Sequence, residues 1–527
     1  MFNATNFTFP TRIARITSIL LLGLAFTACG GSSGSDDDGS PTPSPTSAPT
    51  PTPVVGEVTI PDSYRFENND GESTVSYTGQ TKRHILINDL TQTLLDEDIA
   101  SDTNSDRDEV IKSLNFYYQF DGDTSDSTTS LFTLEGESLI ADDASPASSF
   151  TYGQISSGKD LQGKIAGNDP ALLDGGFIGW SEGLGDSPTP DDLINYWFGK
   201  FADSVSDGVL GFAPVVNDEQ TGVTLASFET PYYVDNNGLD YRQLIQKFLS
   251  VAVAFSQGTA DYLSIDFGSA ENLALEDGKP YTVGQHDFDE AFGYFGAARD
   301  YDAYTDAELK DPSYRDTNND DAIDIRAEFN FGHSTNCAKR DLGSADDAKT
   351  DFTQDAFDAF LEGRAVLASA GNSGELSSER REQLDDAIER AALTWEKCIA
   401  ATAVHYINDM RAHLDPDSEE TVFSKDLPAF LTLDDYFTYA KHFSEMKGFA
   451  LGLQFSPFSP FRNIDSASNM ADLASVLSKM GDSPFMPDTD ATVADSDARK
   501  AYSDSLLEAR DLLQDAYDFD PLNAMGW

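Results

Sequence analysis

Two segments of the sequence place a histidine three residues before an acidic residue. His286 precedes Asp289 and Glu290, and His442 precedes Glu445. On a helix, side chains at positions i and i+3 share one face, and an imidazole and a carboxylate there can bind a metal ion or transfer a proton. We therefore predict that these five residues hold a transition metal, iron or zinc. The alternative is that each histidine is structural and only contacts its neighbouring acid.

The surroundings of the two histidines are also related. Each is followed ten residues later by a glycine, Gly296 or Gly452, and the two segments are 156 residues apart. A helical bundle can bring such elements face to face across its core. His405 and Asp409 form a further pair, at i and i+4 on the apolar stripe of a long predicted helix. A buried pair of this kind requires a polar partner from another element.

An acidic segment in the middle of the chain indicates a second kind of site. An EF-hand loop takes oxygen ligands from positions 1, 3, 5, 7 and 9 and a bidentate glutamate from position 12. The segment offers these ligands, with the glutamate one residue late, as Asp316, Asn318, Asp320, the Ala322 carbonyl, Asp324 and Glu328. We predict a calcium ion that fastens a long loop. A solvated acidic turn without an ion is the alternative.

The first 28 residues are typical of a secretory signal peptide. Two arginines precede the apolar run Ile16–Phe26, whose 11 residues are too few to span a bilayer, which takes about 20. The segment Phe26-Thr27-Ala28-Cys29 resembles a bacterial lipobox, which implies cleavage before Cys29 and lipidation of its sulfur. Gly30 then implies transfer to the outer membrane, with the protein on its periplasmic or cell-surface face. An ordinary signal peptide with an incidental cysteine is the alternative.

The sequence predicts three consecutive regions. Residues 1–28 are the signal peptide, and residues 29–58 are the lipidated cysteine and a tether rich in Pro, Thr, Ser and Gly. Six prolines between Pro41 and Pro53 favour an extended polyproline II stalk. Residues 59–527 form the helical domain, which could contain two related halves at about 59–345 and 346–527.

Composition limits the classes of partner. The 527 residues include 34 Lys+Arg and 91 Asp+Glu, for a net charge of −57. That charge excludes a general nucleic-acid binder, which needs a basic face for phosphate. Apart from the lipobox cysteine, the chain has only Cys337 and Cys398, which in an oxidising compartment could form a disulfide or remain free.

Helical periodicity dominates from residue 60 onward. Long helices are predicted at Ser377–Leu414, Thr432–Leu453, Asp351–Ala370, Ser496–Tyr517 and Leu239–Leu263, and shorter ones at Leu86–Asp96, Asp108–Phe120 and Asp191–Val205. Long connections are expected at 121–185 and 300–350, and a short strand at Ser73–Tyr77. The predicted fold class is mostly α, a helical bundle with long acidic loops.

Five motifs together resemble one family. They are Ile60–Phe66, Val75–Arg83, Asp289–Gly296, Phe331–Arg340 and Ser444–Ala450. These segments look like an uncharacterised bacterial lipoprotein family catalogued as domain of unknown function 4856. The resemblance extends over about residues 60–527 and implies no settled activity.

A weaker resemblance concerns the histidine segments. The spacing Gly284-x-His286-x-x-Asp289 is similar to the Gly-x-His-x-x-Glu hallmark of the imelysin-like lipoproteins, with Asp in place of Glu. The second copy keeps His442 and Glu445 but has Ala440 where glycine is expected. This resemblance implies a bundle of two related halves and a link to iron uptake.

These observations predict a cell-surface lipoprotein that binds a metal ion or a metal-loaded ligand and assists iron uptake. Its partners would be the membrane, through the lipid, and an outer-membrane transporter. Non-catalytic capture of a glycan or peptide is the alternative, indicated by 35 Phe and 20 Tyr. A metallopeptidase is the less favoured alternative, with His286, His442 and Glu445 as ligands and Glu290 as base, because the chain has no His-Glu-x-x-His motif.

Overall fold

The computed structural model of the chain describes residues 58–95, 106–134, 137, 139–140, 148–167, 176–207, 212–218, 223–371, 375–463, 466–491 and 493–527. The predicted signal peptide, Cys29 and nearly all of the predicted tether lie outside the described residues. Residues Glu57–Trp527 form one compact unit. The division of this unit into two related halves stays a prediction.

The described elements are mostly helices. In chain order they are α1 (Thr78–Leu95), α3 (Arg107–Tyr118), α4 (Gly122–Ser125), α5 (Tyr152–Ile155), η1 (Gln162–Lys164), α6 (Pro190–Asp207), β1 (Phe212–Asp218), β2 (Val223–Glu229), α7 (Tyr241–Leu249), η2 (Ser250–Phe255), η3 (Gln257–Tyr262), α8 (Val283–Phe295), η4 (Tyr301–Ala303), α9 (Asp306–Leu309), α10 (Gly332–Gly343), α11 (Phe352–Ala370), α12 (Ser378–Leu414), α13 (Leu433–Ala450), η6 (Leu451–Gln454), α14 (Met470–Met480), α15 (Ser496–Tyr517) and α16 (Pro521–Gly526).

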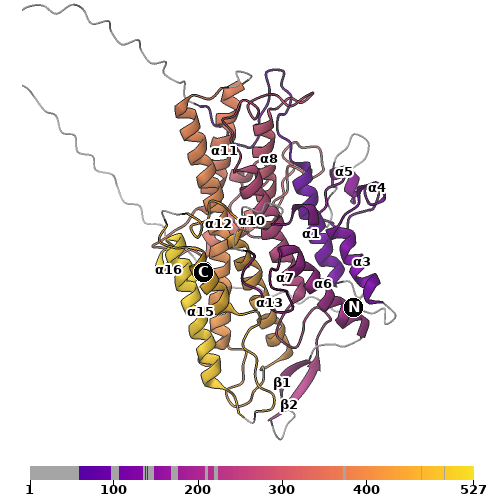
Figure 1. The fold of residues 1–527 in the computed structure, drawn as a ribbon, viewed down its shortest axis with the longest axis vertical. Coiled ribbons are helices and arrows are strands. Elements are labelled where there is room, and N and C mark those ends of the chain that lie inside the picture. The colour runs from indigo at the N-terminus through magenta and orange to yellow at the C-terminus, as the bar shows by residue number, and fades with distance from the viewer. Residues whose placement is uncertain are drawn as a thin grey trace, which may run out of the picture. The chain divides into compact units, whose positions relative to one another are not determined.

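The 37-residue helix α12 is the central element of the bundle. Its N-terminus is capped by Ser377, whose side chain accepts a hydrogen bond from the backbone N–H of Arg380. It ends before Asp415, because the following Pro416 disfavours a helical conformation in the residue that precedes it. Helix α12 packs against α10, α11, α13 and α15, and Figure 1 shows α11 and α15 running alongside it. The predicted mostly α helical bundle is confirmed.

Local capping explains the ends of two other helices near the candidate residues. Helix α13 begins after Thr432, whose hydroxyl accepts a hydrogen bond from the N–H of Asp435 at 3.1 Å, as the sequence of this turn predicts. Helix α8 ends at Gly296, which has a φ of 87°, because glycine adopts this left-handed conformation without steric cost.

The structure departs from the predicted elements in several places. The expected connection at 300–350 contains α10, whose sequence has too few apolar residues to show a helical stripe. The predicted strand at Ser73–Tyr77 makes only a single bridge, between Glu67 and Ser73. The predicted helix Leu239–Leu263 is α-helical only to Leu249 and continues as the π-helical segments η2 and η3. An antiparallel hairpin of β1 and β2, with Phe212 opposite Glu229, was not predicted.

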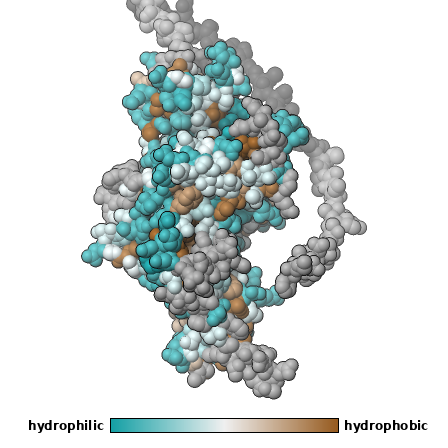
Figure 2. Space-filling model, turned by 90° about the vertical axis from the view of Figure 1, so that its right-hand side faces the viewer, coloured by the Kyte–Doolittle hydropathy of each residue, from teal (hydrophilic) through white to brown (hydrophobic). Residues whose placement is uncertain are grey.

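One hydrophobic core runs through the unit, from Tyr64 to Trp527. The N-terminal helix α1 contributes to it by packing on α7 and α8, and α3 packs on α6. The face drawn in Figure 2 is mostly hydrophilic, with small separate hydrophobic patches, in keeping with the strong negative charge. None of the helices among the described residues is long and apolar enough to span a bilayer.

Candidate functional site

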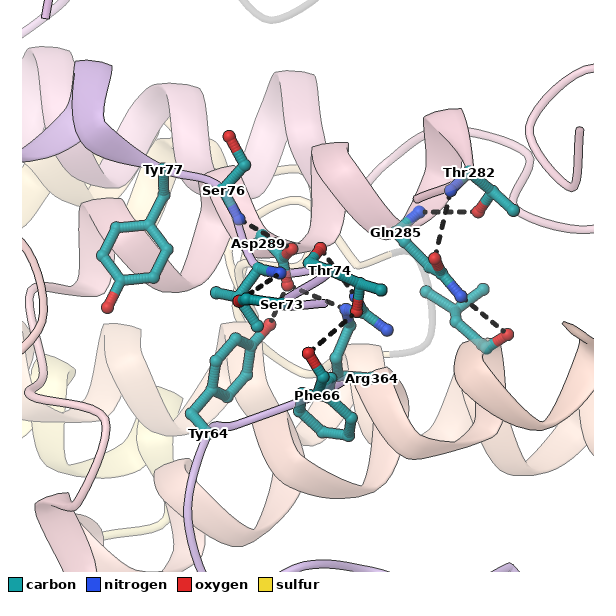
Figure 3. Close-up of polar contacts among 12 residues, drawn as sticks. Tyr64, Phe66, Ser73, Thr74, Ser76, Tyr77, Thr282, Gln285, Asp289 and Arg364 are labelled. Carbon is teal, nitrogen blue, oxygen red and sulfur yellow. Dashed lines mark hydrogen bonds and ion pairs between the residues drawn. The ribbon is translucent and has the colours of Figure 1, made fainter. Parts of the chain in front are cut away.

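Asp289 lies in a fully buried polar network rather than at an open site (Figure 3). Its Oδ1 accepts hydrogen bonds from Arg364 Nε at 2.8 Å and from the Tyr64 hydroxyl at 2.9 Å, and its Oδ2 accepts from the N–H of Ser76 at 3.2 Å. Arg364 also donates to the Thr74 carbonyl. Burial raises the pKa of Asp289, and Arg364 opposes the rise. The carboxylate therefore ties α8 to α11 and to the segment before α1.

His286 points away from this network. Its Nε2 lies 3.7 Å from Glu290 Oε1, and its ring stacks on Tyr281 with centroids 4.9 Å apart. Both His286 and Glu290 are partly exposed, whereas Asp289 is not. The structure thus splits the predicted first group, because the i+3 acid is committed to Arg364 and only the i+4 acid contacts the histidine.

His442 joins a different cluster, on the other candidate helix. His413 Nε2 lies 2.9 Å from His442 Nδ1. Asp409 Oδ2 lies 3.5 Å from the same nitrogen and 3.4 Å from His405 Nε2. His442 is thus the partner that the His405–Asp409 pair required. His413, to which the sequence assigned no role, lies on the same face of α12 at the next i+4 position.

Burial sets the charges of this cluster. It lowers the pKa of His405 to about 3 and that of His442 to about 4, and it raises the pKa of Asp409 to about 6. The imidazoles are therefore neutral at pH 7, and they contact one another and Asp409 in series. Across the residues that the structure describes, no group of three or more His, Cys, Asp or Glu side chains is placed to hold a metal ion. Iron or zinc binding stays a prediction.

Glu445 contacts two lysines instead of His442. Its Oε1 lies 3.4 Å from Lys247 Nζ and its Oε2 lies 2.9 Å from Lys441 Nζ. Burial tends to raise the pKa of Glu445, but the two ammonium groups outweigh it and the pKa falls below its usual value. Glu445 is therefore the counter-ion of Lys247, a residue that the sequence did not single out.

The predicted calcium segment folds as a tight loop. Asp316 accepts hydrogen bonds from the N–H groups of Asn319, Asp320 and Asp321. Asn319 and Asp321 adopt positive φ values of 61° and 64°, a conformation that Asn and Asp tolerate better than most residues. Asp321 thus takes the conformation that glycine usually supplies at position 6 of such a loop.

The glutamate of this loop is engaged by the protein. Glu328 Oε1 accepts from the N–H of Thr317 at 2.8 Å, and Oε2 accepts from the N–H of Asp324 at 2.8 Å. Among the remaining predicted ligands, Asn318 donates to Asp320 at 2.8 Å, and the N–H of Ala322 donates to Asp320 at 3.0 Å. Calcium binding would have to displace Glu328 or use the other oxygens alone, and it stays a prediction.

Cys337 and Cys398 form a disulfide. It joins the short helix α10 to the central helix α12. The sequence left open whether these two cysteines meet. The crosslink fixes α10, which contributes four polar side chains to the cavity described next.

A cavity of about 280 Å³ lies between α1, α7, α10 and α13. Helix α10 contributes His333, Thr335, Asn336 and Lys339. The other helices contribute His84 and Asn88 from α1, Gln246 and Lys247 from α7, and Phe449 from α13, and the loops contribute Phe132, Phe329 and Phe331. Concave sites that combine apolar walls with a few converging polar groups are typical of small-molecule binding.

His333 forms the most constrained polar group of this cavity. Its Nδ1 accepts a hydrogen bond of 2.8 Å from the indole N–H of Trp395, and its ring is 1% exposed. Burial lowers the pKa of His333 to about 3, so the ring is neutral and carries its hydrogen on Nε2. That nitrogen is buried and has no hydrogen-bond partner among the described residues, which is costly unless a ligand or water supplies an acceptor.

This cavity was not predicted from the sequence, although one of the five family motifs lines part of it. The sequence predicted no role for His84, His333, Lys247 or Lys339. The available signal was the motif Phe331–Arg340, which contains six of the lining residues. The motif indicated only the resemblance to the family, because its residue pattern predicts neither a helix nor a cavity.

The fold and cavity define the chain as a helical-bundle protein with a small cavity that combines polar and aromatic side chains. Residues 215–425, which include α7, α10 and all of α12, match the family model described as Domain of unknown function (DUF4856). The resemblance to that family is therefore shown over this region. No curated protein and no solved structure gave a significant match. Similarity to the imelysin-like lipoproteins stays a prediction.

Proposed function

We propose that this chain is a lipid-anchored capture protein that binds a small ligand in the cavity between α1, α7, α10 and α13. The observation that carries the proposal is His333, whose buried Nε2 lacks a partner at a cavity lined by further polar side chains. Outer-membrane anchoring through Cys29 rests on the sequence, as does delivery of the ligand to a membrane transporter.

The volume of the cavity helps to distinguish a small-molecule ligand from a glycan or a peptide. Small-molecule sites usually measure about 300–1,000 Å³, and this one, at about 280 Å³, lies at the lower end. That volume favours a small molecule over a glycan or peptide chain. A small metal chelate is one such ligand and would connect the cavity to the iron uptake that the imelysin-like resemblance implies.

A cavity-filling variant tests the proposal. Asn336→Trp places a large side chain in the cavity from α10, and Leu342→Trp on the same helix is the matched control, because Leu342 is exposed and does not line the cavity. We expect the small-molecule filtrate of a cell extract to raise the Tm of the native chain and of Leu342→Trp, but not that of Asn336→Trp. Equal shifts in all three proteins would refute the proposal.

A further inference from the structure

We infer that the ligand of the cavity is a small organic anion, with a carboxylate or phosphate group held by Lys247, Lys339 and His333 and a planar apolar body held by phenylalanines. This inference rests on the proposed function, because it names the class of ligand that the same cavity takes.

The charge of the cavity lining is opposite to that of the chain. The sequence has a net charge of −57, yet Lys247 and Lys339 line the cavity and none of the described lining residues is acidic. The counter-ion of Lys247 is Glu445, whose Oε1 lies 3.4 Å from Lys247 Nζ and which is shared with Lys441. The Lys339 side chain forms no hydrogen bond or close ion pair with the described residues, and the charges of Asp311 and Glu445 act on it only from a longer distance. Its ammonium group is therefore available to an anion that enters the cavity.

His333 also has a hydrogen-bond donor without an acceptor among the described residues. The indole N–H of Trp395 is only a donor, so it fixes Nδ1 of His333 as the acceptor and leaves the hydrogen on Nε2. The unpartnered Nε2 of His333 and the two lysines are all hydrogen-bond donors, so acceptor oxygens on a ligand would complement this part of the lining. Charge-assisted hydrogen bonds of this kind are stronger than neutral ones.

Aromatic rings form the apolar part of the lining. The Phe329 and Phe331 centroids are 4.4 Å apart, and Phe132 lies 5.2 Å from Phe329. Phe449 of α13 also lines the cavity, with its ring 5.9 Å from Lys247 Nζ. An apolar cavity of about 150 Å³ can hold benzene, so about 280 Å³ leaves room for one ring and an acidic group.

Three small aromatic probes test the inference on the full-length chain. Benzoate and benzamide have the same shape and differ in charge, and phenyl phosphate distinguishes a phosphate from a carboxylate. By calorimetric titration we expect benzoate or phenyl phosphate to bind about tenfold more tightly than benzamide, because hydrogen bonds to charged groups are stronger than neutral ones. The tighter of the two anions identifies the acidic group.

A variant without the Lys339 charge tests whether this residue causes the preference for anions. Lys339→Gln should reduce the preference for the anion over benzamide to about twofold or less, whereas Lys425→Gln, a control that removes the same charge from an exposed ion pair with Asp417, should keep it. Benzamide binding as tightly as both anions would overturn the inference, as would an unchanged preference in Lys339→Gln.

If no probe binds while the extract filtrate still gives its Asn336-dependent shift, the inference fails and the proposed function stands. If the filtrate gives no shift either, both fail.

Discussion

Asp289 Oδ1 lies 2.8 Å from Arg364 Nε, and both side chains are fully buried. This ion pair joins α8 to α11 in the middle of the core, and Tyr64 and Ser76 complete the coordination of the carboxylate. The acid of the first histidine–acid motif, Asp289, therefore stabilises the fold, whereas its histidine, His286, is partly exposed.

Removing one partner of this pair should be strongly destabilising. Arg364→Met leaves the Asp289 carboxylate buried without a counter-ion, and we expect a loss of about 3–5 kcal/mol in the free energy of unfolding. Denaturant titration gives the value. Arg390→Met is the control, because Arg390 is partly exposed and surface pairs contribute about 0–1 kcal/mol. Similar losses in both variants would contradict the assignment, and adding Asp289→Leu to Arg364→Met should recover part of the stability.

Reduction of the disulfide should weaken both the fold and the cavity. Cys337 and Cys398 are 61 residues apart, and closing a loop of that length restricts the unfolded chain by about 4 kcal/mol. The double variant with serine at both positions should lose stability of that order in denaturant titration. Because α10 is then no longer fixed to α12, ligand capture should weaken as well. Unchanged stability after complete reduction would show that the crosslink does not constrain the chain.

Stability should depend on pH through Glu396, a buried residue of α12. Burial raises the pKa of Glu396 to about 8, while its Oε1 accepts a hydrogen bond of 2.7 Å from the Tyr517 hydroxyl. The folded state therefore holds a proton that the unfolded state releases at lower pH. The stabilisation from this group is complete below the unfolded pKa of about 4.3 and is lost as pH rises towards 8.

The variant Glu396→Gln removes this dependence and keeps an acceptor for Tyr517. We expect it to be more stable than the native chain at pH 8 by a few kcal/mol and to show a flatter profile between pH 5 and 8 in thermal melts. Glu382→Gln, at an exposed position of the same helix, should leave the profile unchanged. If the two variants behave alike, Glu396 is not protonated in the folded state.

Calcium is expected to stabilise the loop from Asp316 to Glu328. The Tm of the chelator-treated protein should rise when calcium is added, because a bound ion stabilises only the folded state. Asp316→Asn with Asp320→Asn removes two of the predicted ligand charges and should abolish the rise. The matched control is Asp346→Asn with Asp347→Asn, at another acidic turn. A rise that survives the loop double variant would place any calcium elsewhere.

The proposed lipid anchor would be attached at Cys29. Cys29→Ser removes the sulfur that lipidation requires, so the variant should leave the membrane fraction and appear in the soluble fraction of fractionated cells. Cys337→Ser combined with Cys398→Ser is the control and should remain with the membrane. Membrane association of Cys29→Ser would refute the lipobox interpretation.

The sequence was informative where a helix shows its own pattern. The predicted ranges Ser496–Tyr517 and Ser377–Leu414 agree with α15 and α12 to within a residue, because apolar stripes and caps define them locally. Helix α10 could not be predicted, because its few apolar residues form no stripe and it is held by tertiary contacts. These include the disulfide at Cys337 and the bond between His333 and Trp395.

The candidate site was less predictable for the same reason. Sequence spacing selected histidines and acids that share a helix face, but the partner of each residue comes from a distant segment. Arg364 is 75 residues from Asp289, and Lys247 meets Glu445 across two helices. Residue type and spacing therefore identified polar groups of the core without showing which were paired and which faced a cavity.

Native mass spectrometry tests the central claim most directly. The full chain would be extracted in mild detergent from the membranes of the cells that produce it. The proposed function predicts a small-molecule mass on the native protein and on Leu342→Trp, in addition to the lipid, and its loss from Asn336→Trp. A native protein that carries no small molecule, or an Asn336→Trp variant that retains it, would contradict ligand capture in this cavity.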